Sequence, residues 1–215
     1  MVELKSVLHD LVSRRLIEIK GKIPSVKIPN AVNALKECLQ LVIQKDVIWL
    51  DCYDKVAEWL TDNHNKGLFC MGGCGRGKTE ITQRVIPILL SAYGTYNENN
   101  EWGKPCVRTF NAVDMMDREI FNDILSSRYI CIDDVGTEND SVSYGERRRT
   151  FIELVDAAEK KGKMLIISSN LDLDGLSKKY GDDRLLDRIK ELTFCVNFGN
   201  GSLRQQNQIE YGSRD

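Results

Sequence analysis

Gly72-Gly73-Cys74-Gly75-Arg76-Gly77-Lys78-Thr79 matches the pattern G-x-x-x-x-G-K-[ST], which is typical of the phosphate loop of nucleotide-binding α/β proteins. Glycines let a backbone wrap around a polyphosphate with its N–H groups pointing inward. The loop leads into the first turn of a helix, where unpaired N–H groups attract anions. Lys78 is expected to reach the β- and γ-phosphates, and the Thr79 hydroxyl to ligate Mg²⁺.

The surroundings of this loop favour a phosphate site over a chance glycine-rich turn. An apolar run at 67–71 predicts a buried strand before the loop, and a helix is expected over 78–93. The dinucleotide fingerprint fits poorly, because Gly75-x-Gly77 lacks the third glycine. The residues expected to bind ATP here are Gly73, Cys74, Gly75, Arg76, Gly77, Lys78, Thr79 and Glu80.

Two acidic residues end a second apolar run, YICIDD. Asp133 stands where a strand-end carboxylate holds Mg²⁺, and Asp134 where a general base polarises the attacking water; the alternative is a solvated acidic turn. Asp133-x-x-Gly136 also fits a GTPase motif, but no N-K-x-D follows it, so adenine is favoured over guanine. A third run, MLIIS, leads to Asn170, whose amide can orient water or cap a helix.

Composition limits the class of protein. The 215 residues are 42% hydrophobic and 29% charged, and the net charge of −2 excludes a uniformly basic nucleic-acid binder but not a locally basic face. Seven cysteines without a C-x-x-C pair indicate reduced thiols, and two histidines without suitable spacing disfavour zinc. No apolar run is long enough to span a bilayer, so we expect a cytoplasmic protein without membrane contact.

The chain divides into three predicted zones. Residues 1–45 are expected to form a mostly helical appendage, residues 46–198 a nucleotide-binding α/β domain, and residues 199–215 a polar tail. Apolar runs that alternate with helices predict a parallel sheet covered on both faces. Its strands are expected at 67–71, 106–110, 129–133, 164–168 and 194–198. Its helices are expected at 50–63, 78–93, 112–126, 144–161 and within 173–192.

Four motifs in this order, GGCGRGKT, ICIDDVGTE, LIISSNL and YGDDRLLDRI, resemble the AAA+ ATPases of the DnaC/IstB group over about residues 50–205. These are bacterial and phage helicase loaders and transposition helper ATPases. The resemblance implies a P-loop NTPase of the AAA+ class, with a three-layer αβα fold and a five-stranded parallel sheet of order 5-1-4-3-2. It also implies ATP-driven assembly into a homo-oligomer, binding of single-stranded DNA and, for a loader, a replicative helicase as partner.

The resemblance further assigns individual residues. It makes Asn170 the sensor-1 residue and Arg188 the arginine finger supplied to the ATP of a neighbouring subunit, with Arg184 a weaker candidate. Arg204 matches an arginine near the end of the family's chains that senses nucleotide. Asp134 departs from the family, because many members carry glutamate there; its shorter arm either slows hydrolysis or leaves part of the task to Glu138.

The leading hypothesis is therefore a helicase loader, and two alternatives are a transposition helper ATPase and a nucleotide-gated binding module with little turnover. A small-molecule P-loop kinase is a further alternative. Basic clusters are read either as solvated faces or as a weak, salt-sensitive DNA surface. They comprise the basic residues within 14–27, Arg147–Arg149 at the expected start of a helix, Lys160, Lys161, Lys163, Lys178 and Lys179.

Overall fold

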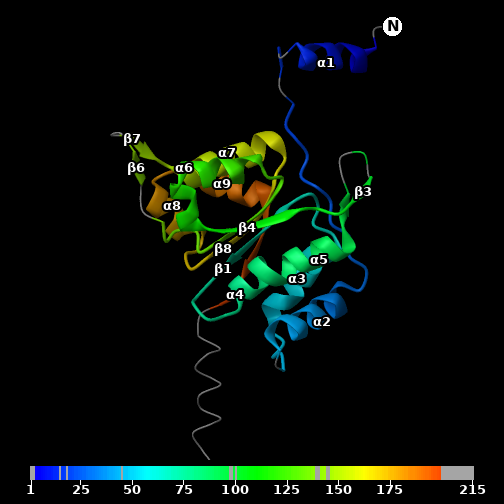
Figure 1. Cartoon of the computed structure of the whole chain (residues 1–215), viewed down its shortest axis with the longest axis vertical. Helices are drawn as coiled ribbons and strands as arrows, with labels where there is room; N and C mark the ends of the chain where they lie inside the picture. Colours follow the sequence, from blue (N-terminus) through cyan, green and yellow to red (C-terminus); the bar gives the residue numbers. More distant parts are fainter. Residues whose placement is uncertain are drawn as a thin grey trace, which may run out of the picture.

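A five-stranded parallel sheet lies at the centre of the protein, which is described by a computed structural model (Figure 1). The described residues are 3–199 apart from 15, 18, 45, 97–98, 100, 139–140 and 144–145; of residues 141–148 only the backbone is described. The strands lie in the order β9-β1-β8-β5-β4, which is 5-1-4-3-2 when these five are numbered along the chain. The expected α/β class and strand order are thus confirmed. The strands are β1 (Gly67–Met71), β4 (Val107–Asn111), β5 (Tyr129–Asp133), β8 (Met164–Ser169) and β9 (Thr193–Asn197).

The central strands are continuous apolar runs because both faces of the sheet are covered. Leu68, Phe69 and Cys70 of β1 are fully buried, and β8 is buried along its whole length. Burying each large apolar side chain stabilises the fold by roughly 1.5–3 kcal/mol. The edge strand β4 is only partly covered and begins one residue later than predicted, since Cys106 is exposed.

Helices form the two outer layers (Figure 1). One layer holds the helices around the phosphate loop, and the other holds the helices that follow β4, β5 and β8. The first layer comprises α2 (Ala31–Ile43), α3 (Asp51–Thr61), α4 (Lys78–Glu80) and α5 (Ile86–Tyr93). The second comprises α6 (Arg118–Ser126), α7 (Thr150–Lys161), α8 (Leu173–Tyr180) and α9 (Asp183–Leu192).

Two predicted helices are interrupted in their interiors. The helix expected over 78–93 contains a π turn at Ile81–Val85, just before Pro87, which lacks the N–H of a regular helical bond. The helix expected over 112–126 begins as a 3₁₀ turn at Ala112–Met116, and α6 follows with Asp117 as its cap, accepting from two backbone N–H groups.

The helix predicted to start at residue 144 starts instead at Thr150, so the expectation that Arg147–Arg149 opens it is wrong. Strands β6 (Ser141–Ser143) and β7 (Glu146–Arg148) precede it as an antiparallel hairpin. The helical apolar periodicity begins only at Phe151 and continues through Leu154 and Val155. Residues before Thr150 therefore have no apolar face that a helix could bury.

Most of the N-terminal segment packs on the α/β core. Ile23, Val26 and Ile28 are buried, and α2 adds further residues to the same core. The buried Asn63 side chain fixes this segment, since it accepts from the Val26 N–H at 2.8 Å and donates to the Pro24 carbonyl at 3.0 Å. Two short strands, β2 (Thr95–Tyr96) and β3 (Trp102–Gly103), form a hairpin beside it.

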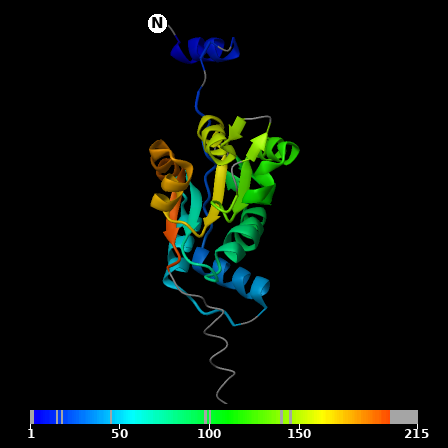
Figure 2. The same ribbon diagram turned by 90° about the vertical axis from the view of Figure 1, so that its left-hand side faces the viewer.

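The first helix, α1 (Leu4–Ser13), buries no residue and stands apart from this body in both views (Figures 1 and 2). The division of the chain at residues 45 and 198 stays a prediction. Residues 200–215, which include Arg204, lie outside the described part. Among the described helices, none combines the length and apolarity that a membrane crossing requires.

Candidate nucleotide site

The carboxyl ends of β1, β5 and β8 meet at one edge of the sheet and form a cavity of about 190 Å³. The phosphate loop from Cys74 to Glu80 lines it together with Asp134 and Asn170. Parallel neighbouring strands bring their ends to one edge, so residues far apart in sequence become neighbours there. The Gly72 N–H donates to the Ser169 carbonyl at 3.3 Å, which joins the loop to the end of β8.

Lys78 lies almost buried at the base of this cavity, with 5% of its surface exposed. Its Nζ donates to the Gly72 and Gly73 carbonyls, both at 2.8 Å, and to Asn170 Oδ1 at 2.9 Å. An ammonium has three hydrogens, so every donor of Lys78 is engaged. Burial lowers the pKa of Lys78, while the neighbouring Cys74 thiol and the Asp133 and Asp134 carboxylates oppose that shift.

Thr79 and Asp133 place two oxygen atoms side by side. The Thr79 hydroxyl donates to Asp133 Oδ1 at 3.2 Å, and the Ser168 hydroxyl donates to the same carboxylate oxygen. Asp133 is only 5% exposed. A hydroxyl and a carboxylate at one position fit Mg²⁺, which takes few protein oxygens and completes its octahedron with water and substrate phosphates.

Asp134 directs a second carboxylate to the phosphate loop. Asn170 Nδ2 donates to Asp134 Oδ1 at 3.2 Å, and the Asp134 N–H donates to the Ser168 hydroxyl at 3.1 Å. Burial raises the pKa of Asp134, and the charge on Asp133 raises it further, although Lys78 and the Asn170 hydrogen bond act against this. A carboxylate with a raised pKa is a stronger proton acceptor.

Other predicted binding residues of the loop take different positions. The Cys74 thiol is exposed. The Arg76 side chain turns back to the end of β9, where its Nε donates to the Phe198 carbonyl at 2.8 Å. Gly75 and Gly77 have φ angles of 74° and 85°, which a residue with a Cβ rarely adopts. These glycines therefore set the path of the loop.

The structure does not bring every predicted residue to the cavity. Arg188 of α9 donates to the Asp156 carboxylate and lies 3.4 Å from Glu159 Oε2. Arg184 is exposed at the start of the same helix. The buried Glu138 carboxylate accepts from the Gly136 N–H at 2.8 Å and does not line the cavity. Arg204 lies outside the described residues.

Among the basic clusters, the one at the end of α7 is smaller than the sequence suggested. Lys163 is 5% exposed, and its Nζ donates to the Ser127 carbonyl at 2.6 Å. Lys160, Lys161 and Lys178 are exposed. Lys163 therefore belongs to the interior and cannot contribute to a DNA surface.

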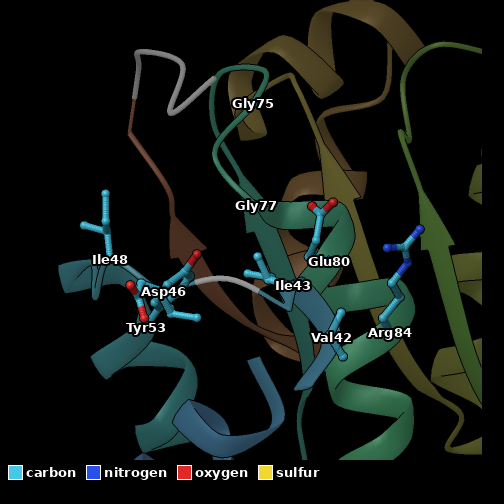
Figure 3. Close-up of a pocket in the computed structure, with 10 residues that line it drawn as sticks. Val42, Ile43, Asp46, Ile48, Tyr53, Gly75, Gly77, Glu80 and Arg84 are labelled. Carbon is cyan, nitrogen blue, oxygen red and sulfur yellow. The ribbon is translucent and has the colours of Figure 1, made fainter. Parts of the chain in front are cut away.

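A second cavity, of about 340 Å³, lies beside the loop and was not predicted (Figure 3). It shares Gly75, Gly77 and Glu80 with the phosphate cavity. Apolar side chains from α2, the following segment and α3 form much of its lining, with three charged residues. These are Val42, Ile43, Val47, Ile48 and Tyr53, with Asp46, Glu80 and Arg84. In Figure 3, Ile43 and Val42 lie across from Glu80 and Arg84.

One feature of the sequence points to this second cavity, the apolar run Val47–Leu50 directly before α3. Apolar walls with a few polar groups next to a phosphate loop suit a planar heteroaromatic ring.

Comparison with solved structures finds proteins that share this α/β fold. DnaI superposes with a TM-score of 0.50 and 17% identity over 80% of this chain and 95% of its own. A DNA replication initiation factor superposes with a TM-score of 0.50 and 20% identity over 79% of this chain. The sequence itself matches no protein-family model and no curated protein sequence.

The likeness to initiator proteins covers only part of those proteins. The chain spans 52% of the replication initiation factor and 48% of AMPPCP-bound DnaA from Aquifex aeolicus, to which its TM-score is 0.48 and its identity 18% over 70% of this chain. At these identities the solved structures bear out the motif resemblance at the level of the fold alone.

Replacing Asp134 by Asn is expected to stabilise the nucleotide-free protein. A raised native pKa means that the folded state holds the proton more tightly than the unfolded chain, whose value is near 3.8. Stability therefore falls as pH rises from that value through the native pKa, and stays lower above it. Asn removes this loss and suits the left-handed φ of 55° at this position.

We expect Asp134→Asn to raise the free energy of unfolding at pH 7 and to leave it unchanged below about pH 4. Urea unfolding at both pH values measures the difference. Asp187→Asn, at an exposed position of α9, is the matched control and should stay within about 0.5 kcal/mol of wild type. Equal stability of Asp134→Asn and wild type at pH 7 would contradict the expected burial of charge.

Proposed function

We propose that the protein binds ATP with Mg²⁺ and hydrolyses it. The observation that carries this proposal is the meeting of Lys78, Asp134 and Asn170 in one cavity bounded by the phosphate loop. A phosphate-binding cation, a proton acceptor and a water-orienting amide are the groups that phosphoryl transfer to water needs. A glycine turn without catalytic purpose does not explain their convergence.

Lys78 binds the β- and γ-phosphate oxygens in this scheme by exchanging them for its present acceptors. Phosphate oxygens carry charge, so they replace the neutral Asn170 oxygen favourably. The loop N–H groups hold the remaining oxygens. Thr79 and Asp133 would hold Mg²⁺, which would neutralise the charge that develops on the phosphates.

Asp134 accepts the proton of the attacking water, and Asn170 orients that water. The water oxygen bonds to the γ-phosphorus, the bond from this phosphorus to the β–γ bridging oxygen breaks, and ADP and phosphate leave. Asn170 Oδ1 is released from Lys78 when phosphate binds, so this oxygen becomes available to the water while Nδ2 keeps its bond to Asp134.

The second cavity is the proposed place of the adenine ring (Figure 3). Ile43 and Val47 supply apolar contact, and Glu80 lies where the loop joins both cavities. A carboxylate can accept a hydrogen bond from the exocyclic amine of adenine. The choice of adenine over guanine rests on the missing guanine motif.

In the cell, the proposed role is that of a helicase loader in DNA replication, acting as a homo-oligomer on single-stranded DNA and a replicative helicase. The four motifs and the AAA+ fold, shared with DnaI over nearly the whole of that chain, support this role. A transposition helper ATPase and a nucleotide-gated module with little turnover remain the other candidates.

The cellular role is tested by measuring mass and ATP hydrolysis with and without single-stranded DNA. We expect Mg-ATP and single-stranded DNA to drive assembly, and Lys78→Ala to lower hydrolysis at least about 100-fold. A replicative helicase should be retained by the assembled protein. Preference for duplex DNA with a transposase would favour the helper ATPase, and assembly without turnover would favour the binding module.

The adenine cavity is tested by filling it. Ile43→Trp is expected to weaken ATP binding at least about tenfold while leaving the binding of inorganic triphosphate unchanged, because only the base loses its space. Leu41→Trp is the matched control, since Leu41 is on the same helix but 76% exposed and outside the cavity. Equal ATP affinity of both variants, measured by calorimetry, would place the base elsewhere.

Arg188 is proposed to act on the ATP of a neighbouring subunit after leaving its carboxylate partners. Arg188→Ala should lower hydrolysis by roughly 10³-fold, and mixing it with Lys78→Ala should restore part of the rate, because intact loop and intact arginine then meet at mixed junctions. Lys190→Ala, exposed on the same helix, is the control. Normal mixing without restored hydrolysis would limit Arg188 to its ion pairs with α7.

A further inference from the structure

Glu138 is a buried acidic residue that neither the phosphate site nor the metal pair uses. It is 4% exposed and lies four residues after Asp134. Its carboxylate accepts from the Gly136 N–H at 2.8 Å and from the Tyr180 hydroxyl. Its backbone carbonyl accepts from Lys179 Nζ at 2.8 Å. One residue thus connects the turn after β5 to the end of α8.

The turn after β5, which Glu138 connects to α8, contains two residues with left-handed backbone conformations. Asp134 has a φ of 55° and Gly136 a φ of 99°, both in the left-handed region. A Cβ at Gly136 would lie 2.8 Å from Leu171 Cδ1, so the turn is also packed tightly against the residues after β8. Conformations of this kind persist only where surrounding contacts fix them.

The contacts at the start of the turn do not extend to its end. The Asp134 N–H and the Val135 N–H both donate to Ser168, to its hydroxyl and carbonyl respectively. Thr137 donates to the Asp134 carbonyl from its N–H and from its hydroxyl. Within the described part of the chain, the hydrogen bonds that tie the turn to another element from Gly136 onward are those of Glu138 to α8.

Tyr180 offers a firm anchor for this bond. It is 8% exposed, and its ring stacks on Phe151 of α7 with centroids 5.2 Å apart. The tyrosine ring is therefore fixed between α7 and α8, and its hydroxyl donates to the carboxylate of Glu138. A charge-assisted hydrogen bond in such a buried setting is strong and directional.

We propose that Glu138 is a positioning residue for hydrolysis, which holds Asp134 toward the phosphate cavity by anchoring its turn to Tyr180. This inference rests on the proposed ATPase function and deepens it. Glu138 does not touch the phosphates and does not replace Asp134 as the base. Since α9 follows Tyr180 and Gly181, the same bond links the catalytic turn to the helix that carries Arg184 and Arg188.

The test compares two variants that each remove one tyrosine hydroxyl. Tyr180→Phe breaks the bond to Glu138 but keeps the stacked ring. Tyr129→Phe removes a bond of 2.7 Å to Thr95 at the opposite end of β5, and neither residue lines the phosphate cavity. For each variant and wild type, kcat, the ATP dissociation constant and the melting temperature are measured with Mg-ATP and single-stranded DNA.

We expect both variants to lose similar thermal stability and to bind ATP within twofold of wild type, with kcat falling at least about tenfold only in Tyr180→Phe. Wild-type kcat in Tyr180→Phe, or an equal fall in both variants, would overturn the positioning role alone. A wild-type protein that binds no nucleotide would overturn the proposed function and this inference with it. A loss of both ATP affinity and kcat in Tyr180→Phe would overturn the positioning role of Glu138 but not the proposed ATPase function.

Discussion

The buried ammonium of Lys78 is the constraint on which the site depends. A desolvated positive charge is costly unless acceptors surround it, and the loop carbonyls and Asn170 supply them. The two carboxylates at the tip of β5 need a cation nearby for the same reason. Mutual compensation of these charges fixes the ends of β1, β5 and β8 against each other. The affinity for a nucleotide therefore depends on how much better its phosphate oxygens accept from Lys78 than the loop carbonyls and Asn170 do.

The parts of the fold that the sequence predicted are those where local pattern and tertiary packing agree. Strands β1, β5 and β8 are apolar runs bounded by polar turns, and they lie within one residue of their predicted limits. Lys78, Thr79 and Asp133 were identified because phosphate and metal binding require these residue types at fixed places after such strands. Their proximity was predictable because parallel strands share an edge.

The parts that the sequence did not predict depend on contacts between distant segments. The sequence predicts a helix from residue 144, whereas residues 146–148 pair with β6 and the helix starts at Thr150, where the apolar face begins with Phe151. Lys163 was grouped with surface lysines, although the Ser127 carbonyl receives its ammonium in the interior. The second cavity needs α2, α3 and the phosphate loop together, and no single segment of sequence contains that information.

The crossing of the N-terminal segment over the end of α7 has a structural consequence. The Gly21 N–H donates to the Lys160 carbonyl at 2.9 Å, and a Cβ on Gly21 would lie 2.3 Å from the backbone of Lys161. The backbones of the two segments are therefore in direct contact, with no side chain between them. Lys20 adds an ion pair of 2.5 Å with Glu159, the residue that also faces Arg188. The segment that follows α1 is thus in direct contact with the end of α7, and Glu159 connects that contact to Arg188.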